Sequence, residues 1–244
     1  MDQFEQLEII YEDSNLIAIN KPSGTLTIPD RFNSELPNLS SILKKKFGII
    51  FIVHRLDRDT SGIILFAKDA ETHRKLNIAF ENSEVIRKYH VIIDGLLPQD
   101  KMEIDIPLRP SRTKVGMTVP SAKGKPSLTK VKIIEKFRNA SLIECELITG
   151  RHHQIRVHLQ TIGYPLLIDE LYGKNTEFYL SSIKKRYNLK KGAKEFPLIS
   201  RLTMHARSLE FKHPISDENI SLKAEYPKDF SALVNVLQKY SGKK

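Results

Sequence analysis

Residues 54–62, with the sequence HRLDRDTSG, bring together groups that can do chemistry. Two carboxylates, Asp57 and Asp59, lie among arginines and a histidine, directly before an apolar run. A polar loop at the edge of a buried strand can hold a carboxylate rigidly, and small residues beside it let a substrate approach closely. The segment predicts either a catalytic carboxylate or a charged turn closed by local salt bridges.

A second segment, residues 150–158 (GRHHQIRVH), carries an arginine and three histidines. If its apolar residues face the core of a helix, Arg156 projects from a neighbouring stripe, with His152 and His153 one turn earlier. A guanidinium can orient a carboxylate through two parallel hydrogen bonds. A metal site is the alternative, but there is no His-Glu-x-x-His pattern, and the lone cysteine is Cys145. The spacing favours hydrogen-bonded histidines over metal ligands.

Tyr89 opens a third segment, which runs from Lys88 to Gly95. A tyrosine at the start of a strand usually packs in the core or at an edge. Its ring can also stack on a nucleobase, whatever the base. The position alone does not decide between these roles.

The elements that position these segments follow an irregular order. Strands are predicted over residues 16–20, 62–68 and 88–93, and helices over residues 39–47, after an N-cap at Asp69, and between Gly150 and Gly163. Charged residues alternate with apolar ones over residues 129–133 and 143–147. This pattern predicts a hairpin with one solvent-exposed face and a turn at residues 138–140. This order predicts an α+β fold rather than repeated βαβ units.

The composition limits the class of protein. The chain has 244 residues, of which 40% are hydrophobic and 28% charged, so it can fill a core. No apolar run approaches the ~20 residues of a membrane span, and the N-terminal residues have no secretory pattern. A single cysteine excludes an internal disulfide framework and predicts a reducing, cytoplasmic location.

The charge points to a polyanionic partner. Lysine and arginine number 39 against 29 acidic residues, a formal net charge of +10. Such a balance suits nucleic acid or an anionic membrane face, or describes a solvated basic surface. Residues 184–194 contain no acid and form either an RNA contact or a solvated loop; their basic residues are Lys184, Lys185, Arg186, Lys190, Lys191 and Lys194.

Taken together, the segments resemble the RluA-type pseudouridine synthases, which isomerise uridine in RNA. Residues 54–68 (HRLDRDTSGIILFAK) closely resemble the catalytic motif of that family. The further motifs, in order, are LIAINKPSG at 16–24, RKYHVIIDG at 87–95, GRHHQIRVHLQTIGYPLLIDELYG at 150–173, MHARSLEFKHP at 204–214 and AEYPKDF at 224–230. Two positions depart from the family pattern: His152 replaces a small hydroxyl residue, and Ile168 replaces a glycine before an aspartate.

The resemblance implies a fold and a set of site residues. It implies an α+β pseudouridine-synthase-like fold, with a mixed, mainly antiparallel sheet, flanking helices and a central basic cleft. Asp57 is implied to be the catalytic aspartate, Tyr89 the active-site tyrosine and Arg156 the group that orients Asp57. The implied substrate-binding residues are Arg55, Thr60, Ser61, His153 and Gln154.

The resemblance also implies the setting of the reaction. We expect one catalytic domain over residues 1–244, without an N-terminal S4-type domain, acting as a monomer in the cytoplasm on ribosomal or transfer RNA and not on membranes. Because the isomerisation conserves all atoms and involves no redox change, we expect neither a cofactor nor a metal. The alternatives are a catalytically silent RNA-binding protein of the same fold and, more distantly, a metal-dependent hydrolase. The presence of Asp57, Tyr89 and Arg156 favours the enzyme.

Overall fold

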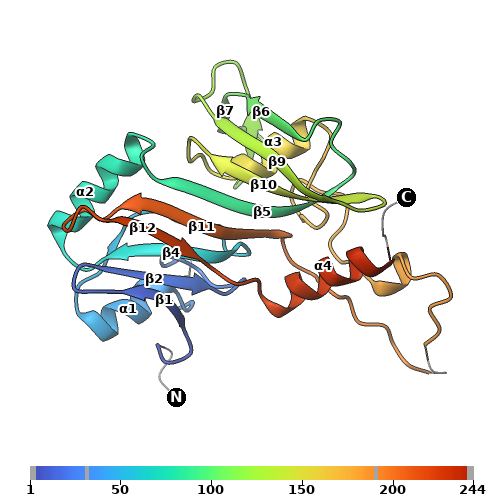
Figure 1. Cartoon of the computed structure of the whole chain (residues 1–244), viewed down its shortest axis with the longest axis horizontal. Coiled ribbons are helices and arrows are strands. Elements are labelled where there is room, and N and C mark those ends of the chain that lie inside the picture. The colour runs from blue at the N-terminus through green and yellow to red at the C-terminus, as the bar shows by residue number, and fades with distance from the viewer. Residues whose placement is uncertain (1–3, 31–32, 190–191, 241–244) are drawn as a thin grey trace. The chain divides into compact units, whose positions relative to one another are not determined.

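A computed structural model describes residues 4–30, 33–189 and 192–240 (Figure 1). The chain divides into two compact units, each built from two stretches of sequence. The first unit comprises Met1–Tyr89 and His205–Glu225, and the second comprises His90–Met204 and Tyr226–Lys244. Lys190 and Lys191, which belong to the basic segment singled out above, lie outside the described residues.

The first unit is built on a mixed sheet. Neighbouring strands follow the order β1 (Glu8–Glu12), β2 (Leu16–Lys21), β4 (Ser61–Ala67), β11 (Met204–Lys212) and the start of β5 (Ile86–Asp94). The short β3 (Phe51–Ile52) pairs with β4, and β12 (Asn219–Lys223) pairs with β11. The pairings β1–β2, β2–β4, β3–β4 and β11–β12 are antiparallel, whereas β4 and β11 run parallel. The helices are α1 (Leu39–Phe47) and α2 (Ala70–Glu81).

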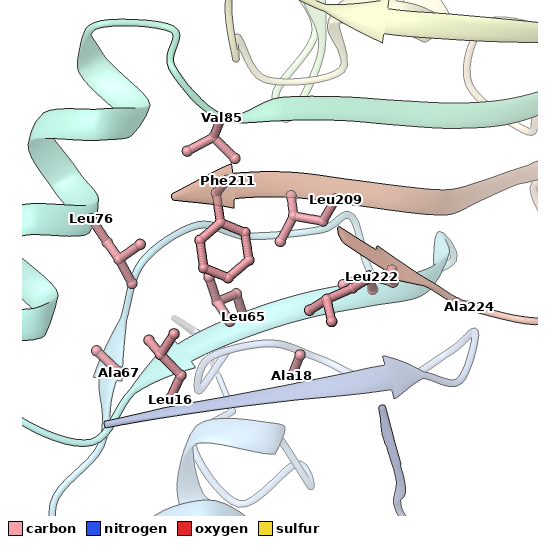
Figure 2. Packing of buried hydrophobic residues seen from close by; sticks show 11 residues of the cluster. Leu16, Ala18, Leu65, Ala67, Leu76, Val85, Leu209, Phe211, Leu222 and Ala224 are labelled. Carbon is pink, nitrogen blue, oxygen red and sulfur yellow. The ribbon is translucent and has the colours of Figure 1, made fainter. Parts of the chain in front are cut away.

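The core of this unit explains why β4 is apolar at every position after Ser61. Each residue of β4 is buried, as expected of a strand with neighbours on both edges and side chains packed on both faces. Figure 2 shows the ring of Phe211, from β11, lying among Leu65 of β4, Leu76 of α2 and Val85. Burial of such side chains contributes roughly 1.5–3 kcal/mol each.

The second unit has its own antiparallel strands. The end of β5 is followed across the sheet by β10 (Ala140–Leu147), β9 (Leu128–Lys136) and β6 (Lys101–Asp105). A separate hairpin joins β7 (Leu108–Pro110) to β8 (Thr118–Pro120). The helices are α3 (Gln154–Thr161), the 3-10 turn η1 (Leu180–Ser182) and α4 (Lys228–Tyr240), and α4 supplies Phe230, Leu233 and Leu237 to the core.

Most of the predicted elements are confirmed. The α1 helix has the predicted bounds, Asp69 caps α2 by accepting a hydrogen bond from the Thr72 N–H, and the β9–β10 hairpin pairs Val131 with Cys145. The α+β class and the mainly antiparallel sheet are confirmed as well. Among the described residues, no helix is both long and apolar enough to span a bilayer.

Two local details differ from the prediction. The α3 helix begins at Gln154, three residues later than the motif suggested, because His153 has a left-handed backbone (φ 55°) that a continuous helix does not allow. Ile168, a departure from the family pattern, packs into the core of the second unit with an exposure of 2%. Its apolar side chain is therefore explained by packing.

Candidate active site

The loop that carries Asp57 is fixed through its backbone. The carbonyl of Leu56 accepts from the Thr27 hydroxyl at 3.3 Å, and that of Asp59 accepts from the Ser23 hydroxyl at 2.8 Å. The Asp57 carbonyl itself accepts from the Thr60 N–H at 3.1 Å, closing a turn. Because the backbone is held on both sides, the half-buried Asp57 side chain is presented from a rigid support.

Lys21, at the end of β2, reinforces the same loop. Its side chain is fully buried, and its ammonium group donates to the carbonyls of Pro22 (3.1 Å), Thr25 (2.7 Å) and Arg58 (2.7 Å). An ammonium group has three donors, so these bonds match its capacity. The opening motif of the sequence therefore serves to brace the Asp57 loop.

The small residues after Asp57 meet tight backbone constraints. Gly62 has φ +112°, and a Cβ there would lie 2.2 Å from the carbonyl oxygen of Ala206. Ser61 is buried and shares a 3.0 Å hydrogen bond with Nδ1 of His205. Thr60 is fully buried, and its hydroxyl has no hydrogen-bond partner among the described residues.

Tyr89 lies in β5 with its side chain buried. Burial, reinforced by the negative charge of Asp57, raises the pKa of Tyr89 to about 12, although the nearby Arg87 acts in the opposite direction. The phenol is therefore neutral at physiological pH, and Asp57 and Tyr89 are electrostatically coupled. The Arg87 guanidinium packs over the ring of Phe80, 5.4 Å from its centroid.

His54, the first residue of the motif at 54–68, makes contacts that stabilise the fold. Its Nε2 accepts a hydrogen bond from the Leu65 N–H at 3.1 Å, and its ring stacks on Phe80 with centroids 5.1 Å apart. Burial lowers the pKa of His54 from 6.5 to about 3, and the charge of Arg87 lowers it further in the same direction. His54 is therefore neutral at physiological pH.

This shift predicts a pH dependence of stability. Below pH 6.5 the unfolded chain binds a proton at His54, whereas the folded chain stays neutral down to about pH 3. The stabilisation is therefore complete above pH 6.5 and decreases as the pH falls. By about pH 4.5 the loss at this site is roughly 2–3 kcal/mol. We expect His54→Asn to be less sensitive to acid than wild type by this amount in urea unfolding at pH 7 and pH 4.5. Equal pH sensitivity of His54→Asn and wild type would contradict the lowered pKa of His54.

Arg156 in the second unit has a buried carboxylate partner. Its Nε and Nη2 donate to the two carboxylate oxygens of Asp169, each at 2.7 Å, and both side chains are buried. Asp169 also accepts from the backbone N–H groups of Leu171 and Tyr172, while the Tyr172 ring packs against the Arg156 guanidinium at 5.0 Å. The guanidinium is thus held in one plane and one direction.

The two histidines before α3 extend this network. Their rings stack 3.7 Å apart. His153 Nδ1 shares a 2.9 Å hydrogen bond with the Tyr172 hydroxyl, and His152 Nδ1 shares a 3.0 Å hydrogen bond with the Thr118 hydroxyl. The Thr118 N–H in turn donates to the Tyr172 hydroxyl at 2.8 Å. These contacts join the β7–β8 hairpin to the start of α3.

Gln154 and His158 make hydrogen bonds within the protein. The Gln154 amide oxygen accepts from Thr149 and from the Arg151 N–H, and its nitrogen donates to Thr129 and to the Leu128 carbonyl. His158 bonds to Thr129 and to the Ile106 carbonyl. Four hydrogen bonds meet the capacity of the Gln154 amide, which favours a role in holding α3. Its predicted contact with substrate stays a prediction.

The predicted site residues thus fall into two groups. Asp57 and Tyr89 belong to the first unit, together with the exposed Arg55 and the buried Thr60 and Ser61. Arg156, His153 and Gln154 belong to the second unit. Among the described residues, no cluster of histidine, cysteine and carboxylate side chains has the make-up of a metal site.

The sequence interpretation missed Lys21 and Asp169 as members of this framework. Asp169 had a local signal, because an aspartate followed by a turn that ends in glycine is typical of an Asx turn. Gly173 fits this role, since a Cβ there would lie 2.6 Å from the Asp169 carbonyl oxygen. No such signal marked Lys21, because its three acceptors are backbone carbonyls, which residues of every type carry.

Comparison with known proteins decides the family. Residues 15–161 match the model of RNA pseudouridylate synthases. The ribosomal large subunit pseudouridine synthase D of Zymomonas mobilis is 36% identical over 242 residues, which cover 95% of this chain and 73% of that protein. The chain belongs to the RNA pseudouridylate synthase family. It is therefore an isomerase that acts on uridine in RNA, as the RluA-type motifs predicted.

Two further relatives extend the comparison. The synthase D of Neisseria meningitidis is 34% identical over 247 residues, and this chain spans 62% of its length. The solved structure of human RNA pseudouridylate synthase domain containing 4 superposes with a TM-score of 0.73 at 25% identity, covering 95% of this chain and 93% of that one. The pseudouridine synthase fold of the chain is thereby confirmed.

Proposed function

We propose that this RNA pseudouridine synthase modifies ribosomal RNA of the large subunit, with Asp57 as its catalytic carboxylate. The relatives from Zymomonas mobilis and Neisseria meningitidis are named as pseudouridine synthases of the large ribosomal subunit, which supports the choice of RNA. The observation that carries the catalytic role is the bracing of the Asp57 loop by Thr27, Ser23 and Lys21. A carboxylate on such a support has little freedom to lose when substrate binds.

The reaction needs a carboxylate for a physical reason. The N1–C1′ bond of uridine breaks, the uracil turns, and C5 bonds to C1′ while the C5 hydrogen leaves as a proton and N1 takes up a proton from water. Positive charge develops at the sugar as the first bond breaks, and a carboxylate next to C1′ stabilises it, as in glycosidases. Asp57 can do so by bonding to C1′, a bond that breaks again when C5 attacks, or by removing a sugar proton to give a glycal and returning that proton as C5 bonds to C1′.

The other residues have distinct proposed roles. Tyr89 presents a neutral ring on which the uracil stacks. Arg156 acts as the partner that orients Asp57, with Nε and Nη2 already fixed by Asp169. Arg55, which is exposed, contacts the RNA backbone, and Thr60 is proposed to contribute to the substrate site. Ser61, His153 and Gln154 are proposed to line the substrate, in addition to their contacts within the protein.

We also propose how the enzyme is organised and where it acts. The two units act together as one catalytic domain with a basic cleft, as a monomer in the cytoplasm, without a cofactor or a membrane. The uridine must leave its stack to meet Asp57, at a cost of a few kcal/mol that is smallest in a loop. A catalytically silent RNA-binding protein of this fold has no use for a braced carboxylate, so the structure favours the enzyme.

The choice of RNA is testable by mapping pseudouridine in cellular RNA with and without the gene. We expect at least one position in large-subunit ribosomal RNA to remain uridine when the gene is deleted. The gene carrying Asp57→Asn should not restore the modification, whereas the wild-type gene should. Loss of pseudouridine from transfer RNA alone would contradict the choice of ribosomal RNA.

A further inference from the structure

The second unit contains a pocket that none of the proposed site residues lines. Its volume is about 410 Å³, within the range of small-ligand pockets. Ala140, Leu167, Leu237 and Phe178 supply apolar walls, and the first three of these side chains are buried. The pocket lies where the start of β10, the segment around η1 and the end of α4 contribute side chains.

The polar part of the lining is cationic. Arg138, Lys184 and Lys185 contribute positive charge, and Asp94 is the single acidic group in the lining. The carboxylate of Asp94 lies 3.5 Å from the ammonium group of Lys174, so its charge is offset. A net positive pocket suits an anion. Lys184 and Lys185 begin the basic segment that the sequence interpretation left open between RNA contact and solvated loop.

Aromatic rings add a second kind of recognition. Phe178 and Tyr240 line the pocket, and the Lys184 ammonium group lies 5.5 Å from the centroid of Tyr240 and 5.6 Å from that of Tyr187. The lysine therefore packs against aromatic faces beside the pocket. The apolar walls and aromatic rings are complementary to the flat base of a nucleotide, and the adjacent cations are complementary to its anionic phosphate.

We propose that this pocket binds an unpaired nucleotide of the substrate RNA, at a point separate from the uridine that is modified. The base enters between the apolar walls and the Tyr240 ring, and its phosphate lies at Lys184, Lys185 and Arg138. The inference rests on the proposed function for the presence of RNA. It assigns the start of the basic segment to recognition of single-stranded RNA.

The charge component is tested with Lys184→Gln/Lys185→Gln in the full-length chain. The probe is a fluorescein-labelled ten-nucleotide oligouridylate, and affinity is measured over a series of salt concentrations. Each phosphate contact in single-stranded RNA contributes about −0.7 to the slope of log K against log[salt], so the slope should become less negative by about 1.4. The matched control is Lys101→Gln/Lys132→Gln. It removes two lysines that lie opposite each other on β6 and β9 and do not line the pocket. An equal change in the control would contradict the proposal.

The stacking component is tested at Tyr240. We expect Tyr240→Ala to weaken binding of the oligouridylate roughly tenfold at every salt concentration, without changing the slope. Tyr240→Phe keeps the ring and should bind as wild type does. A fully paired RNA of the same length should bind both variants alike, because its bases are not available. Equal effects of Tyr240→Ala on paired and unpaired RNA would overturn the proposal.

Two further outcomes separate the alternatives. If uridine 5′-monophosphate alone occupied the pocket as tightly as the oligouridylate, the site would be one for a free nucleotide rather than for RNA. On a modifiable RNA, the Lys184→Gln/Lys185→Gln variant should raise KM and leave kcat unchanged. If wild type formed no pseudouridine in any RNA, the proposed function would fail, and the oligouridylate measurements would still decide the pocket.

Discussion

Replacement of Asp57 by asparagine is expected to abolish turnover and to leave RNA binding nearly intact. The amide keeps the shape of the side chain but cannot stabilise positive charge at C1′, and it is a poor nucleophile and base. Loss of a single electrostatic stabiliser typically lowers kcat by about 10²–10³, and we expect a loss of at least this size. The measurement is release of tritium from uridine labelled at C5, because the C5 hydrogen must leave once per product.

Asp59→Asn is the matched control for this substitution. Asp59 lies in the same loop and is exposed, and the contact that holds it uses its backbone carbonyl. The control removes the same charge two positions away and should retain most of the activity. A thermal melt must show that both variants are folded. Near-wild-type turnover by folded Asp57→Asn, or complete loss with Asp59→Asn alone, would contradict the assignment.

Asp169→Asn is expected to have the largest effect on stability. It replaces a buried carboxylate that accepts two hydrogen bonds from the Arg156 guanidinium, and loss of one partner of a buried ion pair costs about 3–5 kcal/mol. Activity should fall as well, because the guanidinium loses its fixed direction. The free energies of unfolding in urea provide the measurement.

A double-mutant cycle separates this pair from its surroundings. The variants are Asp169→Asn, Arg156→Met and the two combined. Because each single change leaves a buried polar group without its ionic partner, the double variant should be more stable than the sum of the single effects predicts, by about 1–3 kcal/mol. Simple additivity would indicate that the two side chains do not stabilise the fold as a pair.

The fold was predictable where local sequence decides the structure. Asp69 occupies a cap position that its side chain favours, the apolar run of β4 has no polar residue to expose, and the charges of β9 alternate at the period of a strand. The late start of α3 was not predictable, because it depends on the left-handed backbone of His153 and on the four hydrogen bonds of the Gln154 amide.

The site was predictable in its residue types but not in its contacts. The motif around Asp57 contains the carboxylate and the small residues beside it, and Arg156 has the right chemistry to hold a carboxylate. The partners of these groups come from distant positions: Ser61 bonds to His205, 144 residues away, and the Asp57 loop is braced by Lys21. Periodicity carries no information about such pairs, because only the folded chain brings them together.

The measurement that tests the central claim most directly is analysis of the nucleosides after reaction of the purified enzyme with RNA labelled at C5 of uridine. The account predicts that wild type forms one pseudouridine for each tritium released, with no free uracil and no change in the mass of the unlabelled RNA. Folded Asp57→Asn should form none. Release of free uracil, or tritium release without pseudouridine, would contradict the claim that this chain isomerises uridine in RNA.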